Sequence, residues 1–236
     1  METSIVIPVH NERQSLPRLY RQLNQLSKGG AHFGEFLFVN DGSTDGSEKF
    51  LQAIAQNDSR IRLLQSRKHI GKGAALRSGF FESRGDFILC LDSDLQCNPQ
   101  DLLRVRRELD HCDAVLGYRI NRRQADGWGK SFTSRCANHF RNLLLGESIQ
   151  DAGCPIRGFR RRCLAVCDRL DDLDVFLFSL IQAKGYRIKQ IPVTIFPRAF
   201  GKSHYNVRNR AFHLWHMLWI VRKIKRQFMQ KNQTTP

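Results

Sequence analysis

Phe87-Ile-Leu-Cys-Leu-Asp-Ser-Asp-Leu-Gln96 is an apolar run that ends abruptly in two aspartates separated by one residue. A short continuous apolar run is typical of a strand that is buried on both faces of a sheet. Two earlier stretches follow the same plan: Ser4–Val9 is followed by Glu12, and Glu35–Asn40 leads directly into Asp41. Three predicted strands therefore have an acidic residue at or just beyond their carboxyl ends.

Helical segments separate these strands. Leucines at 16, 19, 23 and 26 share one face of a predicted helix. Further helices are predicted over Ser47–Gln56, Gly73–Ser83, Pro99–Leu109 and Val175–Lys184, and further strands over Ile61–Leu64, Ala114–Gly117 and Arg187–Val193. Strands that alternate with helices indicate an α/β fold with a mainly parallel central sheet flanked by helices on both faces.

The chain of 236 residues has the length of one domain and contains no repeat or linker before residue 229. We expect one main domain over residues 1–205 and a basic amphipathic helix over 206–229, packed on the domain or lying at a membrane surface. One face of that helix carries Leu214, Met217, Val221, Ile224 and Phe228. Residues 230–236 have no apolar pattern and are expected to be disordered.

The charge is strongly basic. Lys and Arg number 38 against 22 Asp and Glu, a formal net charge of +16, and no acidic residue follows Asp174. Such a field attracts nucleic acid, anionic lipid or phosphorylated substrates. A nucleic-acid-binding protein is the alternative of a different class, but zinc-finger spacing and aromatic RNA-binding signatures are missing, and the acidic clusters would repel a phosphate backbone.

Seven cysteines form no CxxC pair, which favours reduced thiols in a cytosolic protein. The N-terminal apolar run is too short for a signal peptide, and no run approaches the ~20 apolar residues of a membrane span. We expect a cytoplasmic protein, associated peripherally with the inner face of the membrane.

The acidic residues predict the chemistry. In an open α/β sheet, ligands bind beyond the carboxyl ends of the strands. Asp92 and Asp94 are suited to hold Mg²⁺ or Mn²⁺ together with phosphate oxygens. Asp41 is a candidate acceptor of hydrogen bonds from a nucleobase, or a former of its own Asp-Gly turn, and Asp45 is expected to shape the turn or cap a helix.

The motifs resemble those of family 2 glycosyltransferases with the GT-A fold, and the set is closest to the branch that transfers mannose to dolichyl or polyprenyl phosphate. The matching stretches are Ile7-Pro-Val-His-Asn-Glu12, Val39-Asn-Asp-Gly-Ser-Thr-Asp45, Gly71-Lys-Gly-Ala-Ala75, Leu91-Asp-Ser-Asp-Leu-Gln96, Gly117-Tyr-Arg119, Gly185-Tyr-Arg-Ile188, Pro197-Arg198 and Gly201-Lys-Ser203. The resemblance extends to about residue 205.

The resemblance implies a role for individual residues. The nucleotide-sugar donor would be bound by Pro8, His10, Glu12, Val39, Asp41, Lys72, Asp92, Ser93, Gln96, Arg198 and His204. The metal would be held by Asp92 and Asp94, and the acceptor phosphate would be bound by Arg119, Ser134 and Arg135. The catalytic set would be Asp94, Arg119 and Asp174.

The sequence departs from the family pattern at four positions. His10 replaces the usual Tyr or Phe, Asn40 the usual Asp, His204 the usual Lys, and Phe176 the expected Glu of an Asp-Val-Glu segment. A histidine at position 204 makes that contact sensitive to pH near neutrality.

Two acceptors are compatible with an inverting displacement. A polyprenyl phosphate is already an anion and needs cations rather than a base, which suits the Arg-rich second half of the chain with Arg119, Lys130, Arg135, Arg157 and Arg198. A sugar hydroxyl of a surface glycan or lipopolysaccharide would need a general base, for which Asp151 and Asp174 are the candidates. A nucleotidyltransferase would carry an early Gly-rich loop, where this chain has Val9-His-Asn-Glu12.

Overall fold

The computed structural model describes residues 1–28, 33–121, 138–139, 141–143, 145–166, 173–198 and 200. Seven strands lie in these ranges: β1 (Thr3–Val9), β2 (Glu35–Asp41), β3 (Ile61–Ser66), β4 (Phe87–Cys90), β5 (Ala114–Arg119), β6 (Arg157–Arg160) and β7 (Ile188–Val193). The helices are α1 (Leu16–Lys28), α2 (Ser47–Asn57), α3 (Lys72–Glu82), α4 (Asp101–Glu108), the 3₁₀ segment η1 (Arg161–Val166) and α7 (Leu173–Ala183).

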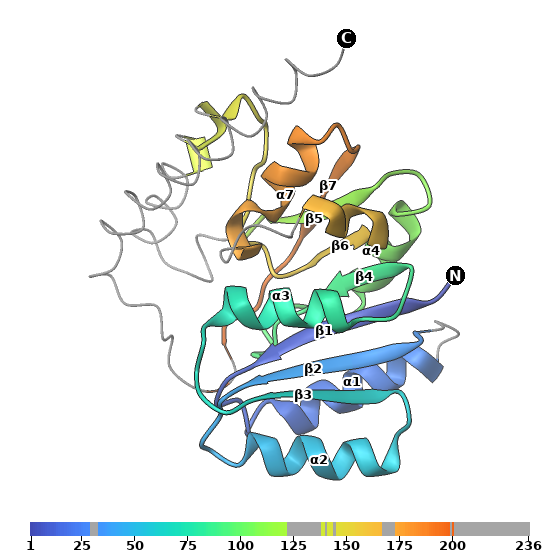
Figure 1. Cartoon of the computed structure of the whole chain (residues 1–236), viewed down its shortest axis with the longest axis vertical. Coiled ribbons are helices and arrows are strands. Elements are labelled where there is room, and N and C mark those ends of the chain that lie inside the picture. The colour runs from blue at the N-terminus through green and yellow to red at the C-terminus, as the bar shows by residue number, and fades with distance from the viewer. Residues whose placement is uncertain are drawn as a thin grey trace, which may run out of the picture.

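The strands form one sheet in the order β3-β2-β1-β4-β6-β5-β7 (Figure 1). Four of its strand pairs are parallel, which confirms the mainly parallel α/β sheet. Strand β6 is antiparallel to both neighbours, β4 and β5. It was not predicted, because arginines at both ends of Arg157-Gly-Phe-Arg160 hide the apolar pattern of a buried strand.

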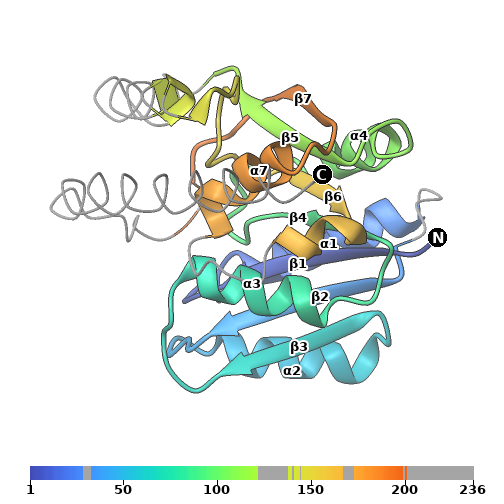
Figure 2. The same cartoon turned by 45° about the horizontal axis from the view of Figure 1, so that its top comes forward.

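Helices cover both faces of the sheet. On β6, Phe159 packs edge-on against Phe80 of α3, with ring centroids 5.1 Å apart. The preceding residue, Gly158, faces Val105 of α4, where a Cβ would lie 2.7 Å from that side chain. Since successive residues of a strand face opposite sides, α3 and α4 lie on opposite faces. Figure 2 shows α1 and α2 on the face away from α3.

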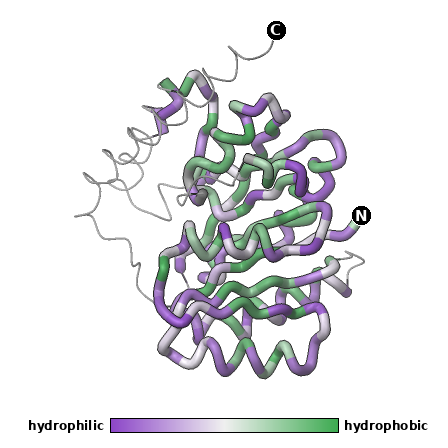
Figure 3. Tube along the Cα trace, viewed as in Figure 1, coloured by the Kyte–Doolittle hydropathy of each residue, from purple (hydrophilic) through white to green (hydrophobic). Residues whose placement is uncertain are grey.

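The core is centred on the three adjacent strands β2, β1 and β4, all of whose residues are buried. Figure 3 shows these strands as hydrophobic segments in the middle of the molecule. Ile5, Phe38 and Leu89 are fully inaccessible to solvent, as expected for strands covered on both faces. This frame fixes the carboxyl ends of β1, β2 and β4 side by side.

Most predicted elements differ from the observed ones by one to three residues at their ends. Among the described helices, none is both long and apolar enough to cross a membrane. The described cysteines Cys90, Cys97, Cys112, Cys154 and Cys163 are buried and free, in agreement with reduced thiols. The predicted helix over 206–229 and the tail 230–236 lie outside the described residues, so the predicted domain bounds stay a prediction.

Candidate active site

The loop after β4 is fixed to the neighbouring strand. Ser93 Oγ donates a hydrogen bond to the carbonyl of Pro8 in β1, 2.8 Å away. Leu95 has a φ of 62°, a left-handed conformation that is rare for a branched residue. Such strain is found where surrounding contacts dictate the backbone, often at functional sites. The loop therefore presents Asp92 and Asp94 in a defined orientation.

Only one of the two carboxylate oxygens of Asp92 has a hydrogen-bond donor among the described residues. Lys72, the first residue of α3, donates from Nζ to Asp92 Oδ2 at 2.8 Å. Asp92 Oδ1 is buried and has no hydrogen-bond partner among the described residues. A buried carboxylate oxygen without a donor costs free energy, which a bound cation would relieve.

Asp94 lies close to the carboxylate of Asp92 and to the guanidinium group of Arg198. Arg198 donates from Nη2 to Asp94 Oδ2 at 2.8 Å and lies 3.7 Å from Glu12. Burial raises the pKa of Asp94, and the nearby Asp92 raises it further, against the lowering effect of Arg198. Burial and Asp94 likewise raise the pKa of Glu12, which Ser15 and Arg198 partly oppose. Negative charge is therefore in excess at this corner.

These observations fit a hard divalent cation at Asp92 and Asp94. The pair supplies oxygen ligands of the kind that Mg²⁺ and Mn²⁺ prefer, and the remaining positions are typical of phosphate oxygens and water. Such an ion would neutralise the Asp92 oxygen that has no donor among the described residues. It would also offset the mutual repulsion of the two carboxylates.

Asp174, at the start of α7, is neutralised within the protein. The fully buried Arg157 of β6 donates to both the side chain and the backbone carbonyl of Asp174. Lys72 Nζ lies 3.8 Å from Asp174 Oδ2. Burial alone would raise the pKa of Asp174, but Lys72 and Arg157 outweigh it, so that the pKa is lowered. The carboxylate is therefore a weak base.

Arg119, the last residue of β5, is paired in the same way. Its Nε and Nη2 donate to the two oxygens of Asp151, at 2.5 and 2.8 Å. A bidentate pair of this kind fixes the plane of the guanidinium group. Asp151 therefore orients Arg119, and this second candidate base is also engaged with a cation.

The predicted nucleobase contact is organised around Asp41. Its carboxylate accepts hydrogen bonds from the backbone amides of Ile70 and Gly71, at 2.7 and 2.9 Å, and lies 2.8 Å from His69 Nδ1. His10 lies 2.7 Å from the Asp41 carbonyl, and its ring is 4.0 Å from that of His69. Asp41 thus holds the loop between β3 and α3 against the end of β2.

His10, Asp41 and His69 also place ligand atoms within 4.8 Å of one another. Both Asp41 oxygens already accept backbone hydrogen bonds, so this cluster lacks the undercoordinated carboxylate that Asp92 offers. Of the two clusters, the aspartate pair is the better candidate site for a divalent cation.

Some of the remaining predicted residues lie in the described part of the chain and others do not. Pro8 and Val39 are buried in β1 and β2, and the backbone amide of Gln96 donates to Asp94 Oδ1 at 3.1 Å. Ser134, Arg135 and His204, like Lys130, lie outside the described residues. Asp45 accepts hydrogen bonds from the backbone amides of Arg13 and Ser47, as expected for a turn residue before a helix.

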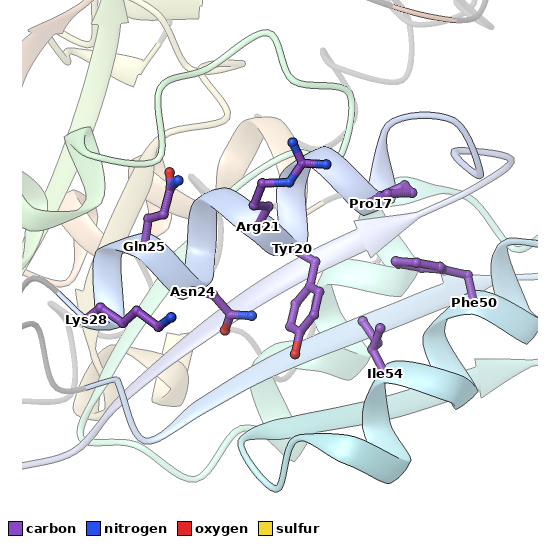
Figure 4. Close-up of a pocket in the computed structure, with 8 residues that line it drawn as sticks. All are labelled: Pro17, Tyr20, Arg21, Asn24, Gln25, Lys28, Phe50 and Ile54. Atoms are coloured by element: carbon purple, nitrogen blue, oxygen red, sulfur yellow. The ribbon is translucent and has the colours of Figure 1, made fainter.

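The sequence did not indicate three of the contacts. His69 was not singled out, and Arg157 was grouped with possible phosphate ligands, whereas it is buried beneath Asp174. The link from Lys72 to both Asp92 and Asp174 joins residues up to 102 positions apart, so no local pattern predicts it. A cavity of about 520 Å³ lies elsewhere, between α1 and α2, and none of its lining residues belongs to the predicted site (Figure 4).

The sequence is similar to that of a protein named as a sugar transferase. The chain is 32% identical over 206 residues to the undecaprenyl-phosphate 4-deoxy-4-formamido-L-arabinose transferase of Salmonella choleraesuis (strain SC-B67). The match covers 87% of this chain and 63% of the relative, so the chain spans less than two-thirds of that protein's length.

Solved structures share the fold. Mannosyl-3-phosphoglycerate synthase from Rubrobacter xylanophilus matches 100% of this chain and 76% of its own, with a TM-score of 0.70 and 17% identity. Glucosyl-3-phosphoglycerate synthase from Mycobacterium tuberculosis, in complex with Mn²⁺ and UDP-glucose, matches 89% of this chain and 74% of its own, with a TM-score of 0.65 and 19% identity. These neighbours bear out the GT-A fold. The model of glycosyl transferase family 2 matches residues 4–166, and the chain belongs to this family.

Proposed function

We propose that this protein is an inverting, metal-dependent glycosyltransferase that moves a sugar from a nucleoside-diphosphate sugar to a polyprenyl or dolichyl phosphate at the inner face of the membrane. The choice of acceptor rests on the ion pairing of the two candidate bases, Asp151 and Asp174. Asp151 and Asp174 are each bound to an arginine. A carboxylate in such a pair has little tendency to take a proton from a hydroxyl group.

A phosphate acceptor does not need that proton transfer. A phosphate oxygen attacks the anomeric carbon as an anion, the bond from that carbon to the diphosphate breaks, and the nucleoside diphosphate leaves with the bonding pair. A divalent cation bound at Asp92 and Asp94 would stabilise the negative charge that develops on the leaving group. The Salmonella relative is named as a transferase to undecaprenyl phosphate, which supports the same class of acceptor.

The residues of this chain have three tasks in that reaction. Arg119, fixed by Asp151, contacts phosphate oxygens of the acceptor as the acceptor approaches the donor. Arg198 contacts the diphosphate beside Asp94. The loop that Asp41 holds, together with His10, lines the space for the nucleobase and ribose.

The deciding experiment compares two acceptors that differ only in their head group. Purified protein is incubated with radiolabelled UDP- and GDP-sugars, Mg²⁺ or Mn²⁺, and either a short polyprenyl phosphate or the matching polyprenyl alcohol. We expect transfer to the phosphate alone and loss of transfer when EDTA is added. Transfer to the alcohol at an equal rate would contradict the phosphate acceptor. The donor is identified beforehand as the nucleotide sugar that raises the melting temperature only with metal present.

A further inference from the structure

Four charged side chains form a row of alternating sign that ends at the aspartate pair: Arg157, Asp174, Lys72 and Asp92. Arg157 binds Asp174, Lys72 lies 3.8 Å from Asp174, and the same Lys72 lies 2.8 Å from Asp92. Lys72 therefore stands between two carboxylates, and in this structure it is hydrogen-bonded to the one that we assign to the metal.

The two carboxylates differ in how firmly they are held. Asp174 is bound through both its side chain and its carbonyl to Arg157, which is fully buried in β6. Asp92 keeps one buried oxygen without a donor among the described residues. Lys72 can move between the two carboxylates, because its side chain is 37% exposed and its ammonium group is carried by a flexible aliphatic chain.

We propose that Asp174 is a positioning residue that acts through Lys72: it forms, with Arg157, a fixed counter-ion onto which Lys72 moves when a divalent cation occupies Asp92. This inference rests on the metal site of the proposed function. A lysine ammonium group and a divalent cation repel each other strongly if both contact the same carboxylate. The move from 3.8 Å to hydrogen-bond distance of Asp174 requires a displacement of only about 1 Å.

Lys72 and Asp174, which lie side by side in space, should have opposite effects on metal binding. Lys72 competes with the metal for Asp92, so its removal strengthens metal binding. Asp174 offers Lys72 a second partner, so its neutralisation leaves Lys72 on Asp92 and weakens metal binding. A purely structural role of the cluster would weaken binding in both cases.

The test measures Mn²⁺ binding alone, from the free-ion signal in electron paramagnetic resonance, for a double-mutant cycle. We expect Lys72→Met to bind Mn²⁺ about tenfold more tightly and Asp174→Asn about tenfold less tightly than the unchanged protein, the size of one pairing between partly exposed charges. In the Lys72→Met background, Asp174→Asn should change the affinity less than about threefold, since its effect passes through Lys72.

Controls separate the possible failures. Lys189→Met removes an exposed lysine that pairs with Glu108, the last residue of α4, and it should leave Mn²⁺ affinity unchanged. Circular dichroism checks that each variant folds, and Lys72→Met alone still tests the sign if Asp174→Asn does not fold.

Two results would overturn the inference alone: weaker Mn²⁺ binding by Lys72→Met, and an equal effect of Asp174→Asn in both backgrounds. Absence of Mn²⁺ binding in all of the proteins would overturn both the inference and the metal site on which it rests. An unchanged Mn²⁺ affinity in Asp94→Asn would instead show that the cation binds elsewhere, which is a failure of the proposed metal site itself.

Discussion

Asp92 and Asp94 are two residues apart, but different elements supply the cations that they contact. Lys72 comes from the start of α3, whereas Arg198 follows β7, more than a hundred residues later in the chain. The aspartate pair was predictable from the sequence because it directly follows an apolar run. The two cations were not predictable as its partners, because their contacts depend on how α3 and the segment after β7 pack against β4.

Asp94→Asn tests the pair at the level of one side chain. The amide keeps the shape of the residue but removes a charge that Arg198 and the proposed metal both contact. We expect sugar transfer to fall at least about a hundredfold, the scale of losing one electrostatic contact to the developing charge. Asp110→Asn is the matched control, since Asp110 is an exposed aspartate paired with Arg106, and it should transfer sugar at the unchanged rate. Full activity of Asp94→Asn would remove the metal assignment.

At the level of elements, Glu35 at the start of β2 joins three neighbours. Its carboxylate accepts hydrogen bonds from Ser4 of β1, Arg62 of β3 and the backbone amide of Arg84. Burial pushes the pKa of Glu35 up, but these donors outweigh it and hold the pKa below its ordinary value of 4.5. The ionised form is thus the one that ties the strands together.

Glu35→Gln should therefore lower stability in a pH-dependent way. A carboxyl group whose pKa is lowered on folding stabilises the folded state above its unfolded pKa and loses this contribution as the pH falls through the folded pKa. We expect a loss of about 1–3 kcal/mol in the free energy of unfolding at pH 7, and a shrinking difference from the unchanged protein below pH 4.5. Urea unfolding at several pH values measures it. Glu48→Gln on α2 should cost less than about 0.5 kcal/mol, and an equal cost at pH 3 and 7 would contradict the assignment.

Gly42, in the turn after β2, tests the loop that Asp41 holds. Its φ is +64°, and a Cβ there would lie 2.5 Å from the backbone of His69. Gly146 has a similar φ of +67°, but none of the described residues has an atom within 4 Å of a Cβ placed there. Gly146→Ala should cost about 1 kcal/mol for the left-handed backbone alone, whereas Gly42→Ala should cost about 1–3 kcal/mol more and weaken nucleotide binding. Equal unfolding midpoints for the two variants would argue against the close packing of this loop.

The parallel part of the fold was predictable from the sequence, because β1, β2 and β4 are apolar runs and α1 has leucines on one face. Strand β6 was not, since it buries an arginine where a strand pattern calls for an apolar residue. That arginine is balanced by Asp174, which lies 17 residues later. A compensated buried charge of this kind cannot be recognised before the two residues are known to meet.

At the scale of the whole molecule, the net charge of +16 suits a protein that works on anions at an anionic surface. We expect the protein to bind vesicles that contain anionic lipid and to lose most of that binding when the salt concentration rises from about 0.05 to 0.5 M, because exposed charges are screened. Co-sedimentation measures it. Equal binding to neutral vesicles, or binding that salt leaves unchanged, would contradict an electrostatic association.

The position of β6 in the sheet has a consequence for synthesis. A nascent chain that has emerged only as far as residue 150 already contains the motifs of β1, β2 and β4, yet the edge of β4 has no hydrogen-bonding neighbour until β6 arrives. An open edge of that kind invites pairing with other chains. The front half alone would therefore leave this edge of β4 unpaired, and the two aspartates gain their final surroundings, which include Arg198, only after the ribosome has delivered the later segment.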